Sequence, residues 1–288
     1  MKLLVIHGPN LNMLGSREPE IYGIDTLDTI NQYLVEKADA LNVQLDFYQS
    51  NHEGAIIDKI QAAACYDGIV INPAAFTHYS IALLDTLTAT SIPAVEVHLS
   101  DLSKRESFRR HSVTERACID QIYGYGKDSY VYGIEALIGH NIARLLKQEA
   151  STMTGSDAIY RRVVEILHKA FPKYDWTGIY LIDGDELVLH NFIGDPSPHE
   201  RIPIGKGICG AAVAESKTII VEDVQTDARY LACSPRTKSE IVVPFYSNNK
   251  CIGEIDIDSH QINAFHVHDR RYLEKIAHIL GASLSGPE

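Results

Sequence analysis

The sequence lacks several features that would place it in a familiar class. It has no apolar run long enough to cross a membrane, no start that resembles a secretory signal, no internal repeat and no low-complexity segment. Its five cysteines are odd in number and include no CxxC pair. Together these absences predict a reduced, cytoplasmic protein.

Basic residues are also scarce compared with acidic ones. The chain has 26 Lys and Arg against 38 Asp and Glu, a net charge of −12, and the acidic excess is present in both halves. This balance argues against nucleic acid or an anionic membrane as the main partner. With 288 residues, 45% of them hydrophobic, the chain can bury two cores. We expect domains at residues 1–148 and 158–288, joined by a Ser/Thr-rich linker at 149–157.

Predicted strands alternate with predicted helices in the first half. The strands are expected at residues 2–7, 44–49, 68–71, 92–97 and 121–125. The helices are expected at residues 25–41, 52–64, 80–88 and 130–150. This order predicts an α/β fold with a right-handed, doubly wound parallel sheet of five strands.

Polar clusters follow three of these strands, at residues 10–22, 72–78 and 96–100. Ligands of such sheets bind beyond the carboxyl ends of the strands, so the three clusters predict an active site at one sheet edge. The first loop does not supply the GxGxxG of a dinucleotide site. Asn10, Asn12 and Asn72 stand where a phosphoryl-accepting receiver domain needs acidic residues.

Four motifs in this half resemble the type II 3-dehydroquinate dehydratases over residues 1–147. They are GPNLNMLGSREPEIYG, SNHEGAIID, INPAAFTHYSIALLD and EVHLSDLSKRESFRRHS, in the family's order and spacing. The resemblance implies a flavodoxin-like fold, a homododecamer built from trimers and no cofactor. The implied reaction is the lyase step of the shikimate pathway that takes water from 3-dehydroquinate and gives 3-dehydroshikimate.

The resemblance also implies a role for each catalytic residue. Tyr22 is the base, and Arg17 helps it to ionise below its ordinary pKa of about 10. An Arg about 4 Å away favours the tyrosinate by up to roughly 4 kcal/mol at intermediate dielectric. His98 is the acid, oriented by Glu96 on the same strand face, and Asn10 holds a water against the enolate oxygen.

Further positions match substrate-binding residues of the family: Asn72, His78, Leu99, Ser100 and Arg109. Asp85 matches a residue that a neighbouring subunit lends to the site. Asp101 departs from the family's usual Asn and adds a negative charge, which weakens the binding of an anionic substrate modestly unless the side chain points away. Because glycines bracket residues 16–22, we expect this segment to be a lid that orders over the substrate.

The second half has the pattern of an α+β domain with an antiparallel sheet. Helices are expected at residues 158–170, 207–215 and 267–284. Strands are expected at residues 178–182, 186–190, 218–224, 241–246 and 251–258. The turns at Gly184-Asp185 and Asn248-Asn249 predict two hairpins.

This half resembles a GAF domain over residues 157–286, and within that family the free methionine-(R)-sulfoxide reductases. The matching stretches are WTGIYLIDGDELVL, RIPIGKGICGAAVAE, ACSPRTKSEIVVP and GEIDIDS. The resemblance implies that Cys233 is the nucleophile and Cys209 a partner thiol. The substrate-binding residues that it implies are Glu240, Asp256, Asp258 and Trp176.

Two departures leave the function of this half open. His199 stands where that branch usually has a further cysteine, and Ser234 follows Cys233 in place of an Asp. The domain is therefore a reductase of free methionine sulfoxide, a regulatory module that binds a small ligand, or a module for association. For the whole chain, the alternative to an enzyme is a sensor that retains a dehydratase scaffold. We expect no metal site, and we expect His260, His266 and His268 to be surface loop residues.

Overall fold

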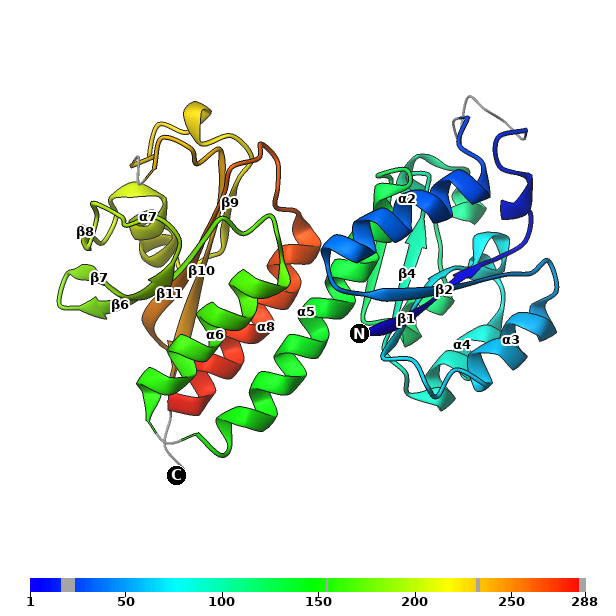
Figure 1. Ribbon diagram of the computed structural model, residues 1–288, viewed down its shortest axis with the longest axis horizontal. Helices are drawn as coiled ribbons and strands as arrows, with labels where there is room; N and C mark the ends of the chain where they lie inside the picture. The colour runs from blue at the N-terminus through cyan, green and yellow to red at the C-terminus, as the bar shows by residue number, and fades with distance from the viewer. Residues whose placement is uncertain (17–23, 154, 232–233, 285–288) are drawn as a thin grey trace. The chain divides into compact units, whose positions relative to one another are not determined.

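The computed structural model describes residues 1–16, 24–153, 155–231 and 234–284. The chain divides into two compact units, Met1–Leu137 and Ile138–Glu288 (Figure 1). Helix α5 (Asp128–Ala150) includes the first two residues of the predicted linker. The domain boundary at residue 148 stays a prediction. No helix of the described residues has the length and apolar character needed to cross a membrane.

The first unit has an all-parallel sheet with the strand order β2-β1-β3-β4-β5, which confirms the predicted fold class. The strands are β1 (Lys2–His7), β2 (Gln44–Gln49), β3 (Gly68–Asn72), β4 (Ala94–His98) and β5 (Asp120–Tyr123). The apolar run of β1 is buried on both faces, since Leu3, Leu4, Val5 and Ile6 are each 0% exposed. That burial is why the strand lacks the alternation of a half-exposed sheet.

Helices cover both faces of this sheet (Figure 1). They are α2 (Leu27–Ala40), α3 (Glu53–Gln61), α4 (Ile81–Thr90) and the start of α5. A capping box begins α2, because the Thr26 hydroxyl accepts from the Thr29 N–H and the Thr29 hydroxyl accepts from the Thr26 N–H. Ile56 and Ile60 of α3 pack with Leu83 of α4 in a core that also holds Leu4 of β1.

The second unit has a six-stranded antiparallel sheet in the order β8-β7-β6-β11-β10-β9. Its strands are β6 (Trp176–Asp183), β7 (Glu186–Ile193), β8 (Arg201–Pro203), β9 (Ile219–Val221), β10 (Ser239–Ser247) and β11 (Lys250–Ser259). Both hairpins are present, and Asn248 and Asn249 both have positive φ, as a tight primed turn requires. The short edge strand β8 was not expected.

Three helices cover this second sheet: α6 (Ser156–Ala170), α7 (Gly207–Glu215) and α8 (Val267–Leu284). Helix α7 packs on one face, where Ile208 and Ala212 share a core with Trp176 and Tyr180. Helices α6 and α8 lie beside each other on the opposite face (Figure 1). The expectation that His268 is a surface residue is wrong: it lies in the first turn of α8, 1% exposed, and its Nε2 is 3.3 Å from Asp269 Oδ2.

Candidate functional site

The loops after β1, β3 and β4 meet at one edge of the first sheet, because these strands are parallel neighbours. His7 and Asn72 are register partners at the ends of β1 and β3. The Gly8 N–H donates to the Asn72 carbonyl oxygen at 2.8 Å. A Cβ atom at position 8 would lie 2.5 Å from the Pro73 carbonyl oxygen. Only glycine lets these two loops approach so closely.

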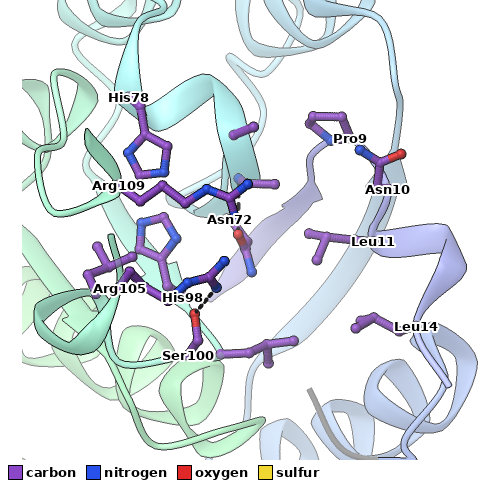
Figure 2. Close-up of a pocket in the computed structure, with 14 residues that line it drawn as sticks. Pro9, Asn10, Leu11, Leu14, Asn72, His78, His98, Ser100, Arg105 and Arg109 are labelled. Atoms are coloured by element: carbon purple, nitrogen blue, oxygen red, sulfur yellow. Dashed lines mark hydrogen bonds between the residues drawn. The ribbon is translucent and has the colours of Figure 1, made fainter. Parts of the chain in front are cut away.

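A cavity of about 220 Å³ opens at this edge (Figure 2). Seven of the eleven residues predicted for the first site line it: Asn10, Asn72, His78, His98, Leu99, Ser100 and Arg109. The other lining residues are Pro9, Leu11, Leu14, Ala74, Ala75, Leu102 and Arg105. Of the remaining four predicted residues, Glu96 lies beneath His98 and Asp85 lies exposed on α4 outside the lining. Arg17 and Tyr22, and with them the predicted lid, lie outside the described residues.

His98 forms a buried pair with Glu96 at the carboxyl end of β4. Their Nε2 and Oε1 atoms are 2.7 Å apart, and the side chains are 7% and 0% exposed. Burial would raise the pKa of Glu96, but its hydrogen bond and charge interaction with His98 and the hydroxyls of Thr114 and Thr77 lower it to about 2. Glu96 is therefore ionised at neutral pH and only accepts hydrogen bonds. It follows that Nε2 of His98 carries a hydrogen and donates a hydrogen bond to Glu96.

Neutral side chains satisfy the remaining hydrogen-bonding capacity of the Glu96 carboxylate. Besides His98, Oε1 accepts from Thr77 Oγ1 at 2.7 Å and from Gln121 Nε2 at 2.8 Å. Oε2 accepts from Ser112 Oγ at 3.2 Å and from the Thr114 hydroxyl. None of these four was predicted from the sequence, since a Ser or Thr in a loop is too common to signal a buried anion. Together they hold the carboxylate, and through it the His98 ring, in one orientation.

A second buried network fixes Asn72. Its Oδ1 accepts from the Ala74 N–H at 3.1 Å, and its side chain is hydrogen bonded to the Tyr130 hydroxyl. Tyr130 is 2.8 Å from Nδ1 of His7, whose Nε2 is 2.9 Å from Asn31 Oδ1. Burial, only partly opposed by the bond to Asn31, lowers the pKa of His7 to about 4, so this ring is neutral at pH 7. His7 and Tyr130 were also not predicted, and they act on the cavity only through Asn72.

The remaining polar groups around the cavity carry donors. Nδ1 of His78 donates to the His111 carbonyl oxygen at 2.8 Å, so Nε2 is the ring nitrogen that takes no part in this hydrogen bond. Arg109 lines the cavity, and Arg105 donates from Nη1 to Ser100 Oγ at 3.2 Å (Figure 2). Arg105 was missed in the prediction, although it belongs to the same basic motif as Arg109.

Asp101 was expected to weaken an anion site if it faced the substrate. Its carboxylate instead accepts from the N–H and the hydroxyl of Ser103, at 2.9 and 2.6 Å, and pairs with Lys104 Nζ at 3.1 Å. It is not among the cavity lining. These bonds, chiefly those with Ser103 and Lys104, lower the pKa of Asp101. Asp101 therefore caps a short turn beside the cavity, and the cavity keeps its basic character.

The second unit brings together most of the residues predicted for the GAF site. Cys209 Sγ lies 3.7 Å from Glu240 Oε1 and 3.5 Å from Asp256 Oδ2, and all three residues are buried. Asp258 is 4% exposed on the same strand as Asp256. Burial, then the charges of Asp256, Asp258 and Glu254, raise the pKa of Glu240 well above its ordinary value. Cys233 lies outside the described residues.

Trp176 is part of the core beside Tyr180, with its indole N–H donating to the Asp195 carbonyl oxygen at 3.0 Å. Glu254 was not predicted. It is 0% exposed and shares a face of β11 with Asp256 and Asp258, because the three positions are spaced by two residues. The sequence GEIDIDS could have indicated Glu254, because a strand with three acidic residues on one face can bury that face only at a large cost in free energy.

An open parallel sheet with a buried acid–base pair at a cavity beyond its carboxyl edge defines an enzyme of the flavodoxin-like architecture. Residues 1–138 match the dehydroquinase class II family model, and residues 156–284 match the GAF domain model. The 3-dehydroquinate dehydratase of Acaryochloris marina is 55% identical over 139 residues, which are 48% of this chain and 93% of that protein. The chain belongs to the class II dehydroquinase family and is an enzyme that also carries a GAF domain.

Two solved structures are similar to one half each. The type II dehydroquinase of Butyrivibrio crossotus has 51% sequence identity and a TM-score of 0.47, covering 48% of this chain and 97% of that one. The free methionine-R-sulfoxide reductase of Neisseria meningitidis, solved in complex with its substrate, has 36% identity and a TM-score of 0.49. That similarity covers 51% of this chain and 88% of the reductase.

Proposed function

We propose that the first unit dehydrates 3-dehydroquinate to 3-dehydroshikimate. The observation that carries the proposal is the buried His98–Glu96 pair at the wall of a polar cavity that Asn72, His78 and Arg109 also line. The substrate class follows from the family to which the chain belongs. Elimination of water next to a ketone needs a base, an acid and a group that stabilises an enolate. His98 at this cavity is the proposed acid, and Tyr22 and Asn10 are the proposed base and enolate-stabilising residue.

In the proposed anti elimination, Tyr22 as tyrosinate takes the proton next to the ketone, and Arg17 stabilises the tyrosinate. The electron pair moves into an enolate, whose oxygen is held by a water on Asn10. The enolate then re-forms the ketone and expels the hydroxyl. His98 protonates that hydroxyl, so the hydroxyl leaves as water and a carbon–carbon double bond forms. Because the Nε2–H of His98 is bonded to Glu96, this proton comes from Nδ1 of the doubly protonated imidazolium, whose charge the Glu96 carboxylate balances.

The substrate is an anion with several hydroxyls, and the cavity has donors for both kinds of group. We propose that the N–H groups of Leu99 and Ser100 bind its carboxylate, and that the guanidinium of Arg109 donates to ring hydroxyls. Arg105 beside Ser100 adds positive charge at the carboxylate end. Asp85, exposed on α4 and outside this cavity, would serve the cavity of a neighbouring subunit in a homododecamer of trimers.

Replacing Tyr22 with phenylalanine tests the assignment of the base. We expect wild type to convert 3-dehydroquinate to the conjugated enone, followed by its ultraviolet absorbance, and the variant to lose at least about 100-fold in kcat. Tyr66→Phe is the matched control, because the Tyr66 hydroxyl is bonded to Asp46 on β2, away from the cavity. A Tyr22→Phe enzyme with full activity would exclude Tyr22 as the base, and an inactive wild type would exclude the proposed reaction.

We propose reduction of free methionine (R)-sulfoxide as a second activity, in the GAF domain. The favouring observation is the thiol of Cys209 among buried carboxylates of the kind that would bind a substrate ammonium. Cys233 attacks the sulfoxide sulfur and takes its oxygen as a sulfenic acid, releasing methionine. Cys209 or an external thiol then forms a disulfide with Cys233 and releases that oxygen as water. The external thiol would act in place of the further cysteine usual in that branch, where this chain has His199.

A reductase assay with dithiothreitol as the external thiol separates the possible roles of this domain. We expect wild type to consume free methionine (R)-sulfoxide and Cys233→Ser to lose the activity. Equal rates in the two proteins would exclude Cys233 chemistry. If neither protein reacts while methionine sulfoxide raises the melting temperature, the domain is a ligand-binding module, and the regulatory or sensor alternative gains.

A further inference from the structure

One face of the second sheet buries an unusual concentration of acidic groups against α7. Glu254 and Asp256 come from the central strand β11, and Glu240 comes from its neighbour β10. Cys209, in the first turn of α7, faces them. None of the four residues is more than 5% exposed. Arg229, whose charge interacts with Glu240, forms its direct ion pairs with Glu215 and Asp227.

The hydrogen bonds that this cluster makes do not account for its polar atoms. Cys209 has one thiol proton, yet its sulfur lies 3.5 Å from a carboxylate oxygen of Asp256 and 3.7 Å from one of Glu240. Both oxygens of Glu254, and Oδ1 of Asp256, are buried without a hydrogen-bond partner among the described residues. Glu254 is 0% exposed and Asp256 is 2% exposed. Buried carboxylates with unpartnered oxygens are rare, because the loss of hydration costs several kcal/mol unless a cation or donor replaces it.

Glu254 lies on the same face of β11 as Asp256, two residues away along the strand. One ligand atom each from Cys209, Glu240 and Asp256 lies within 4.8 Å of the other two. A compact group of one sulfur and two carboxylates, with Oδ1 of Asp256 left over and the buried Glu254 on the same strand face, is the arrangement that a cation would complete.

The separations fit a tetrahedral metal ion. With metal–sulfur and metal–oxygen bonds of about 2.3 and 2.1 Å, tetrahedral geometry places a sulfur and an oxygen ligand about 3.6 Å apart. The two observed sulfur–oxygen distances, 3.5 and 3.7 Å, lie on either side of this value. A thiolate ligand disfavours Mg²⁺ and Ca²⁺, which prefer oxygen alone, and favours Zn²⁺ among divalent ions with no redox chemistry.

We propose that Cys209, Glu240, Asp256 and Glu254 form a binding site for Zn²⁺ in the GAF domain. On binding, zinc–sulfur and zinc–oxygen bonds form, and the thiol proton of Cys209 and any protons held by the carboxyl groups leave to solvent. The sequence led us to expect no metal site, because that expectation was based only on the spacing of the histidines. The proposed site departs from it. It does not depend on the dehydratase, and it competes with the reductase, since Cys209 and Asp256 cannot hold a metal and a substrate ammonium together.

Titration of the tag-free, full-length protein with Co²⁺ tests the proposal, because cobalt replaces zinc and reports its ligands by absorption. After treatment with a chelator, we expect one equivalent of Co²⁺ to give a thiolate-to-cobalt charge-transfer band and visible bands of tetrahedral cobalt. One equivalent of Zn²⁺ should remove these bands and raise the melting temperature. No band, and no change in melting temperature with Zn²⁺, would overturn the site.

Variants then identify the ligands. Cys209→Ser should abolish the charge-transfer band, and Glu254→Gln, which keeps the shape of the side chain, should weaken Co²⁺ binding by about 100-fold or more while keeping the band. Cys251→Ser is the matched control, since Cys251 lies on the same strand with its Sγ 3.5 Å from the Gly253 carbonyl oxygen. An unchanged band in Cys209→Ser, or a band lost only in Cys233→Ser, would refute this ligand set. Full Co²⁺ affinity in Glu254→Gln would remove Glu254 from it. These spectra do not require either enzymatic activity, so a failed activity assay and a failed metal site are told apart.

Discussion

Replacing His98 with alanine is expected to lower kcat for dehydration by about 10² to 10⁴-fold, the usual contribution of a positioned general acid. The expelled hydroxyl is a poor leaving group unless it is protonated, and the described residues place the His98 ring at the cavity wall with Glu96 behind it. Since the first proton is taken by another residue, KM should change much less than kcat. Steady-state kinetics on the enone absorbance measure both quantities.

His52→Ala is the matched control for the loss of an imidazole. His52 is exposed at the start of α3, and its side chain makes no capping hydrogen bond. We expect its kinetics to equal those of wild type. If His98→Ala retained more than about a tenth of the wild-type kcat, the acid would have to be sought elsewhere, with His78 the next candidate at the same cavity.

Replacing Glu96 with glutamine is expected to affect both catalysis and stability. It removes a charge-assisted hydrogen bond from His98, a loss of about 1.5–3 kcal/mol. That energy corresponds to roughly a 10- to 100-fold lower kcat. Steady-state kinetics should show this loss in kcat with little change in KM. A merely structural role for Glu96 would leave the kcat of the folded variant unchanged.

The same substitution should change how stability depends on pH. The pKa of Glu96 is about 2 in the folded protein, below its ordinary value of 4.5. The unfolded chain therefore binds more protons between these values, so the stabilisation is complete above pH 4.5 and is lost as the pH falls towards 2. For this buried group the loss is roughly 3 kcal/mol. Chemical denaturation at pH 7 and pH 3 should show a smaller difference for Glu96→Gln than for wild type.

The elements of the fold could be predicted because each follows from local sequence. The run from Leu3 to Ile6 has no polar residue, so it suits only a strand covered on both sides, and Thr26 with Thr29 starts the next helix with its own capping bonds. The edge strand β8, at Arg201–Pro203, could not be predicted in this way. It has three residues, and only its pairing with β7 makes it a strand.

The candidate site could be predicted where its residues follow strand ends or, as with Arg109, stand in one of the family's motifs. Asn72 and His98 were found because each closes a buried apolar strand. The donors to Glu96 were not found, because Thr77, Ser112 and Thr114 come from turns whose convergence depends on the tertiary fold. The same limit applies to His268, because its burial comes from packing around α8 and cannot be predicted from the local sequence pattern.

The strand order in the two sheets has a consequence for the order in which the chain folds during synthesis. In the first unit, every strand of the sheet has been made by Tyr123. In the second, β11 lies between β6 and β10, so the middle of that sheet stays open until Ser259 has been added. Until then β6 exposes an unpaired edge, which other chains could pair with. The enzyme unit can thus fold early, while the GAF domain must wait for one of its last strands and is the part that most needs protection from aggregation on the ribosome.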